Sequence, residues 1–139
     1  MTISPAVLLA GLFSAKDRDY ADRLDELAAR VEVLGGRVVG RFVQRRGVSH
    51  GGVRLMGRPL SRRFVVGPGK VREIAAACVD RDVDGVVFAN ELDAYRRRRL
   101  YEALGTPVLA AADLAGDLPL AHLLRTAEGE AAQRKRRSG

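Results

Sequence analysis

The chain has one cysteine, no tryptophan, three tyrosines and four phenylalanines among its 139 residues. A lone Cys78 excludes an internal disulfide and a cysteine-based metal site, which favours the cytoplasm. Long hydrophobic runs are also missing. The run near the start, residues 6–13, is far shorter than the roughly 20 residues that span a bilayer. The sequence therefore argues against disulfide-rich secreted proteins and against membrane proteins.

Positive charge, in contrast, is abundant and concentrated. Lysine and arginine number 24 against 17 acidic residues, giving a net charge of +7. Residues 41–63 contain no acid, and their seven arginines account for the whole excess (Arg41, Arg45, Arg46, Arg54, Arg58, Arg62 and Arg63). A basic stretch on an otherwise balanced chain indicates a surface that faces a polyanion. A solvated loop from a G+C-rich, arginine-biased genome is the alternative.

Strand-like and helix-like patterns alternate along the chain, with 47% hydrophobic and 29% charged residues, as in globular domains. The predicted strands are residues 6–13, 37–43, 62–66, 84–88 and 107–109. The predicted helices are residues 19–34, a segment after Lys70, residues 90–104, and residues 118–137 with Pro119 in the first turn. This order predicts an α/β fold: one domain with a mostly parallel sheet of four to five strands, flanked by helices, and a C-terminal helix. We divide it into an α/β domain, residues 1–112, and a linker-like helix with a basic tail, residues 113–139.

Three of the predicted strands end in residues that suit ligand binding: Gln44 to Arg46, Gly67 to Lys70, and Asn90 with Glu91. Ligands of parallel α/β sheets bind at the carboxyl ends of the strands, so these groups are expected on one rim. Gly67, Gly69 and Lys70 before a helix favour contact with an anion, with a tight structural turn as the alternative. No hydroxyl residue follows Lys70, so this is not a phosphate-binding P-loop and no nucleotide cofactor is supported.

The run of four arginines at residues 96–99 covers every side of a helix. Arg96 lies between Leu92 and Leu100 on the helical wheel, so we expect it either to extend its charged end to an edge of the apolar face or to meet Glu91, Asn90 or an external anion. Arg97 and Arg98 are expected to be solvated. Glu91 and Arg96 are the only catalytic candidates, and the two histidines are too far apart in sequence to indicate a metal site. Cys78 is predicted to be a small core residue.

Several segments together resemble a known family: LDEL at residues 24–27, VVG at 38–40, QRR at 44–46, FVVGPGK at 64–70, EI at 73–74, VVFANEL at 86–92, and RTAEG at 125–129. Over residues 7–129 the chain resembles the N-terminal domain of HflX-type ribosome-associated GTPases. The resemblance implies an α/β unit that, with a helical linker, reaches the peptidyl transferase region of the large ribosomal subunit. It places Gln44, Gly67, Gly69, Lys70, Asn90 and Glu91 on a functional rim.

The chain differs from whole HflX proteins in its domains and in one motif. Whole HflX proteins split or rescue ribosomes and hydrolyse GTP in a separate, later domain, which this sequence does not contain. A nucleotide-binding role has also been attributed to their N-terminal part. The chain has Asp93-Ala94-Tyr95-Arg96 where the family typically carries Ser-Pro-x-Gln, and only a short linker-like helix follows. We therefore expect a diverged N-terminal domain without the GTPase motifs.

Two functions from different classes fit these observations. The first is a non-enzymatic module that binds the large ribosomal subunit or other RNA, with contacts from Gln44, Arg45, Arg46, Arg54, Arg58, Gly67, Gly69, Lys70, Asn90 and Arg96. The second is a small-molecule binder or biosynthetic enzyme with a pocket on the rim, using Glu91 as acid/base and Arg96 or Lys70 to hold an anionic substrate. No metal or resident cofactor is expected, and the short strand 107–109 at a sheet edge suggests a homodimer.

Overall fold

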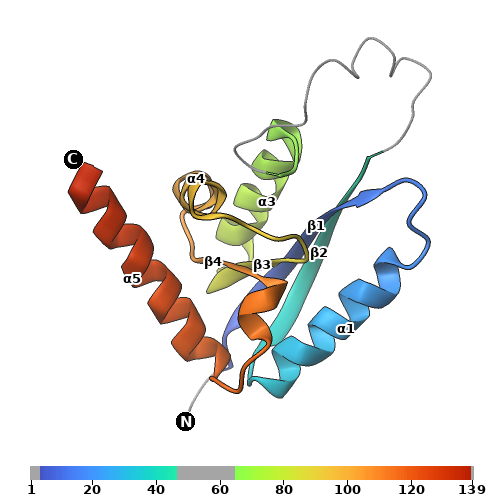
Figure 1. Cartoon of the computed structure of the whole chain (residues 1–139), viewed down its shortest axis with the longest axis horizontal. Coiled ribbons are helices and arrows are strands. Elements are labelled where there is room, and N and C mark those ends of the chain that lie inside the picture. The colour runs from blue at the N-terminus through green and yellow to red at the C-terminus, as the bar shows by residue number, and fades with distance from the viewer. Residues whose placement is uncertain (1–3, 47–64, 139) are drawn as a thin grey trace.

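Strands and helices alternate in the computed structural model, which describes residues 4–46 and 65–138 (Figure 1). The strands are β1 (Ala6–Ser14), β2 (Arg37–Arg46), β3 (Gly85–Phe88) and β4 (Val108–Ala110). The helices are α1 (Tyr20–Val33), α3 (Pro68–Asp80), α4 (Ala94–Leu104) and α5 (Leu120–Ser138), with a short 3-10 helix η1 (Ala111–Leu114). The strands form one parallel sheet in the order β2-β1-β3-β4. The predicted single α/β domain with a C-terminal helix is confirmed.

Strand β1 lies in the middle of the sheet and supplies both hydrophobic cores. Leu8 and Ala10 belong to the core formed with α3 and α4. Val7 and Leu9 belong to the opposite core, formed with α1, η1 and α5. All four side chains are completely buried. The uninterrupted apolar run of β1 therefore reflects a strand covered on both faces, since successive residues point to opposite sides.

The predicted third strand at residues 62–66 is wrong where the structure describes it. Val65 and Val66 form a bend, and Val65 has a φ of 71°, a left-handed conformation that β-branched residues rarely adopt. Val66 is fully buried in the core beneath α3. The segment thus turns the chain into α3 instead of extending the sheet, while residues 62–64 lie outside the described residues.

Two helices begin later than predicted, each for a local reason. Helix α4 begins at Ala94 and not at residue 90, because Asp93 caps it by accepting a hydrogen bond from the Arg96 backbone nitrogen at 2.8 Å. Helix α5 begins at Leu120, and Pro119 precedes its first turn. The Pro119 carbonyl accepts hydrogen bonds from the backbone nitrogens of His122 and Leu123 at 3.0 and 3.1 Å.

A β-bulge fixes β2 against β1. The pairing shifts between Val7 and Leu8, so that Val39 is an extra residue on β2. The Val39 carbonyl accepts a hydrogen bond from Arg81 Nη1 at 2.7 Å. A Cβ on the next residue, Gly40, would overlap that guanidinium, so glycine is needed for Arg81 to approach the bulge. The bulge carbonyl is thereby satisfied by a residue that follows α3.

The first turns of α5 belong to the same core as the sheet. Leu120 is fully buried and Leu124 nearly so. A Cβ on Gly85, at the start of β3, would overlap the Leu124 side chain, so glycine leaves the space that this leucine fills. The Leu120 backbone nitrogen also donates to the Leu34 carbonyl at 2.9 Å. A functional boundary near residue 112 stays a prediction, but packing continues past it.

Candidate functional site at the carboxyl edge of the sheet

The carboxyl ends of the parallel strands form one edge of the sheet, here called the carboxyl edge. Gln44, near the end of β2, accepts a hydrogen bond on Oε1 from the Gly67 backbone nitrogen at 2.8 Å. The end of β2 and the start of α3 therefore meet, as the resemblance implied for Gln44 and Gly67. The contact stabilises the entry to α3, because an otherwise unsatisfied backbone donor gains an acceptor.

Asn90 connects the loop after β3 to the central strand. Its Oδ1 accepts from the Leu12 backbone nitrogen at 2.8 Å, and its Nδ2 donates to the Leu12 carbonyl at 3.0 Å. The side-chain amide thus makes the two hydrogen bonds to Leu12 that a backbone residue of a neighbouring strand would make, at a point where β3 has already ended. Its polar atoms are occupied by the fold, so Asn90 shapes the carboxyl edge.

The glycine–lysine turn lies at the start of α3, with Pro68 as the first helical residue. A Cβ on Gly69 would have only Arg72 near it, at 3.9 Å, so packing does not require glycine there. Lys70 Nζ forms an ion pair with Glu73 Oε2 at 3.0 Å, one turn further along α3. Lys70 is therefore at the predicted place, with a charge partly balanced by its own helix.

The two arginines that end β2 differ in their surroundings. The Arg45 guanidinium lies 4.0 Å from the centre of the Tyr20 ring and donates hydrogen bonds to the carbonyls of Ser14, Ala15 and Asp17. Arg46 is exposed, and no acceptor for its side chain is found within residues 4–46 and 65–138. Arg54 and Arg58 lie outside the described residues.

The catalytic candidates do not meet in the described structure. Arg96 forms an ion pair with Asp93 at 3.0 Å and not with Glu91 or Asn90. Glu91 is exposed and lines neither of the two hollows described below. The alternative of a pocket built around Glu91 and Arg96 is therefore not favoured by this geometry.

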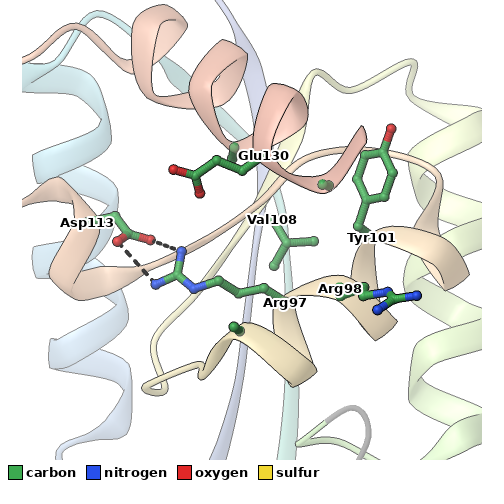
Figure 2. Close-up of a pocket in the computed structure, with 9 residues that line it drawn as sticks. Arg97, Arg98, Tyr101, Val108, Asp113 and Glu130 are labelled. Carbon is green, nitrogen blue, oxygen red and sulfur yellow. Dashed lines mark hydrogen bonds and ion pairs between the residues drawn. The ribbon is translucent and has the colours of Figure 1, made fainter. Parts of the chain in front are cut away.

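A hollow of about 260 Å³ lies between α4 and α5, at a place that the sequence analysis did not single out. Figure 2 shows Arg97 reaching across it to Asp113, with bonds of 2.6 and 3.1 Å. Arg97 Nε also donates to the Leu92 carbonyl at 3.1 Å. The prediction that Arg97 is solvated is wrong, because its partner stands sixteen residues later in η1. Arg98 pairs with Glu102 at 3.3 Å, so it is not free either.

A second hollow of about 440 Å³ lies at the carboxyl ends of β1 and β3, beside α1. Its charged wall comes from Asp17, Arg23, Glu26 and Arg30. After β1 the chain turns to α1 on one face of the sheet, and after β3 it turns to α4 on the other face. In open α/β sheets, ligands bind between two neighbouring strands whose connections diverge in this way. The spacing of residues 23, 26 and 30 places them on one face of a helix. This spacing is the sequence signal from which the charged wall of the second hollow could have been predicted.

Other predictions concern metals, membranes and the sheet edge. Within residues 4–46 and 65–138, no group of three His, Cys, Asp or Glu side chains is placed to hold a metal ion. No described helix is both long and apolar enough to cross a membrane.

Strand β4 lies at the sheet edge, and its three residues are each at most 3% exposed. A homodimer through this edge stays a prediction. Cys78 is buried, as predicted.

These features define a parallel α/β domain whose carboxyl edge joins the glycine–lysine turn, Gln44 and Asn90. The family described as GTP-binding GTPase N-terminal matches residues 21–115, and the chain belongs to this family. Two curated relatives, each named GTPase HflX, support the same assignment. The one from Alkalihalophilus pseudofirmus is 25% identical over 116 residues, covering 84% of this chain and 25% of the relative. The one from Lacrimispora saccharolytica is 30% identical over 107 residues, covering 77% of this chain and 23% of the relative. The chain thus spans about a quarter of the length of these relatives.

Proposed function

We propose that the chain is a non-enzymatic RNA-binding module that docks on the large ribosomal subunit through its carboxyl edge. Membership of the GTPase N-terminal family supports this proposal, together with the basic charge of the chain. Such a partner implies a cytoplasmic location. The GTPase named in the relatives belongs to those proteins, and no GTP-dependent step is assigned to this chain.

The observation that carries the proposal is the contact between Gln44 and Gly67. It brings together the two ends of the segment that connects β2 to α3. That segment contributes Arg54, Arg58, Arg62 and Arg63 and no acid. Both of its ends are therefore anchored at the carboxyl edge, next to exposed Arg46 and to Lys70. A concentrated set of cations suits phosphate contacts.

The residues of the interface divide into two groups by their contacts. Arg46, Arg54, Arg58 and Lys70 are proposed to contact phosphates directly, with Gly67 and Gly69 allowing close approach of the backbone. Gln44, Asn90 and Arg96 are proposed to act indirectly, because their polar atoms already bind Gly67, Leu12 and Asp93. The low aromatic content favours contacts to backbone and shape over stacking of single-stranded bases.

Co-sedimentation with isolated large ribosomal subunits over a salt series tests the proposal. Arg46→Gln is compared with Arg37→Gln, which removes an exposed arginine from the opposite end of the same strand. We expect Arg46→Gln to weaken binding and to reduce the slope of log affinity against log salt by about 1, as one phosphate contact does. Arg37→Gln should bind like the unaltered protein.

Two results would contradict this proposal. One is the absence of association at low salt by protein whose circular dichroism shows it folded. The other is binding that does not respond to salt, because phosphate contacts necessarily release counterions.

A further inference from the structure

The β1–α1 loop, residues 15–19, is held by an arginine from another strand. Arg45 Nη2 donates to the carbonyls of Ser14, Ala15 and Asp17 at 3.0, 2.8 and 2.9 Å. Its guanidinium also packs over the Tyr20 ring at 4.0 Å, a cation–π contact. Arg45 therefore contacts both sides of the loop, through Nη2 and through the face of its guanidinium.

Further contacts fix the same loop. Asp17 forms an ion pair with Arg23, and the Asp17 side chain is only 13% exposed. Four hydrogen bonds order the backbone: Ala15 N to Arg46 O at 3.0 Å, Lys16 N to Ser14 Oγ at 3.2 Å, Asp17 N to Ser14 O at 3.0 Å, and Asp19 N to Asp17 Oδ1 at 2.9 Å. These bonds restrict the conformations that the loop can adopt.

This conformation leaves two cations exposed. Lys16 and Arg18 are exposed on either side of Asp17, whose carboxylate is engaged by Arg23. Neither side chain has an acceptor among the residues that the structure describes. Two further acids lie near them, Asp19 at the N-cap of α1 and Asp22 in its first turn, where the positive end of the helix offsets their charge. The Ala15–Arg46 hydrogen bond places the loop beside exposed Arg46.

We propose that the β1–α1 loop is a second phosphate-contact element, in which Lys16 and Arg18 bind RNA phosphates and Arg45 positions them without touching the RNA. This inference rests on the proposed RNA-binding function. An ordered loop loses less entropy on binding, so its two cations are better prepared than those of a loop without such contacts. Arg45 is thus a positioning residue and not a phosphate ligand.

A double-mutant cycle separates these roles. The three proteins are Lys16→Gln/Arg18→Gln, Arg45→Gln, and the combination of all three changes, each assayed with large ribosomal subunits over a salt series. We expect Lys16→Gln/Arg18→Gln to lower the salt slope by about 2 and the affinity roughly fivefold to tenfold per lost contact near 0.1 M salt. Arg45→Gln should also weaken binding, and the combined protein should bind no worse than the Lys16→Gln/Arg18→Gln protein.

Conservative variants and a structural readout complete the design. Lys16→Arg/Arg18→Lys keeps both charges and should keep binding. Arg45→Lys keeps the charge but loses the planar group that reaches the loop carbonyls, so it should behave like Arg45→Gln. Amide hydrogen exchange of Ala15 and Asp17 should speed up in both Arg45 variants, while urea unfolding confirms that each protein is folded.

Each contrary result has a distinct meaning. Additive losses in the combined protein, or full binding by Arg45→Lys, would show that Arg45 contacts the RNA itself and would overturn its positioning role. Unchanged binding by Lys16→Gln/Arg18→Gln, with weakened binding by Arg46→Gln, would overturn the loop contact and leave the proposed function standing. Failure of the unaltered protein to bind would overturn both proposals together.

Discussion

Asp113 is the residue at which three segments of the fold converge. Its carboxylate accepts two hydrogen bonds from Arg97 of α4 and one, at 2.8 Å, from the backbone nitrogen of Ala110 at the end of β4. The side chains of Arg97 and Asp113 are 33% and 27% exposed, so the pair is partly shielded from water. Bidentate, charge-assisted bonds of this kind are stronger than ordinary surface ion pairs.

Replacing this carboxylate should therefore destabilise the protein. We expect Asp113→Ala to lower the free energy of unfolding by about 2 kcal/mol, because Arg97 and the Ala110 backbone lose their acceptor together. Urea denaturation measures the change. Asp117→Ala is the matched control. The Asp117 side chain is fully exposed, and its carboxylate comes no closer than 3.9 Å to Arg30, so its ion pair is weak. Equal unfolding midpoints for the two variants would show that the Asp113 bonds contribute nothing.

Cys78 offers a residue-scale prediction about pH. Burial raises the pKa of the Cys78 thiol from its ordinary value of 9.0 to about 11. At pH 8 only about one thiol in 1,000 is then ionised, so native protein should react with a disulfide reagent roughly 100-fold more slowly than unfolded protein. Similar rates in native protein and in urea would contradict a buried thiol.

The same pKa has a consequence for stability. The folded state holds the thiol proton more tightly than the unfolded state, so this contribution is complete below about pH 9 and is lost as pH rises toward about 11. Unfolding free energies at pH 8.5 and 10.5 should therefore differ less in Cys78→Ala than in the unaltered protein. Other groups titrate in this range, and the comparison between the two proteins removes their effect.

At the scale of elements, helix α5 has a buried first part and an exposed second part. Its first turns fill space left by Gly85 and contact the sheet, whereas Arg125, Glu128 and Glu130 beyond them are exposed. The family match ends at residue 115, before α5 begins. The core nevertheless includes Leu120 and Leu124, so the domain is incomplete without the start of this helix.

Truncation of one leucine tests this reading of α5. We expect Leu120→Ala to lower the free energy of unfolding by about 3 kcal/mol, because a fully buried leucine leaves a cavity. Leu118→Ala removes the same group from a position that is 52% exposed and should change stability little. Thermal unfolding followed by circular dichroism compares the two. A small effect at residue 120 would mean that α5 is not part of the domain core.

At the scale of the whole molecule, the excess of positive charge comes from one segment of the chain. Among the described residues, cations and acids alternate at both edges: Lys16 and Arg18 lie beside Asp17 and Asp19 at the carboxyl edge, and Arg81 lies between Asp80 and Asp82 at the opposite edge. The excess comes from the arginines of residues 41–63, and the Gln44–Gly67 contact anchors both ends of the segment between β2 and α3 at the carboxyl edge, where a polyanion would be attracted. The proposed docking edge agrees with this placement.

The sequence predicted the sheet better than it predicted the site. The apolar runs of β1 and β3 and the glycines after α1 and α4 are local signals, so strand identity and fold class could be inferred. Residues 62–66 looked like a strand because the letters RRFVV carry no sign that Val65 adopts a positive φ. The bonds between Asn90 and Leu12 join positions 78 apart, and no local pattern reports such a contact. Arg45 illustrates the main difficulty, because an arginine that holds its own loop looks in sequence like one that holds a ligand.

The central position of β1 also matters while the protein is being made. Strand β1 is synthesised before its two neighbours and pairs with β2 first, but its other edge stays open until β3 has been synthesised. A nascent chain that has not reached residue 85 therefore exposes an apolar strand edge, a form prone to pairing with other chains. Closure of the second core waits longer, until Leu124 has emerged. The open edge of β1 is thus exposed for as long as residues 47–84 are being synthesised.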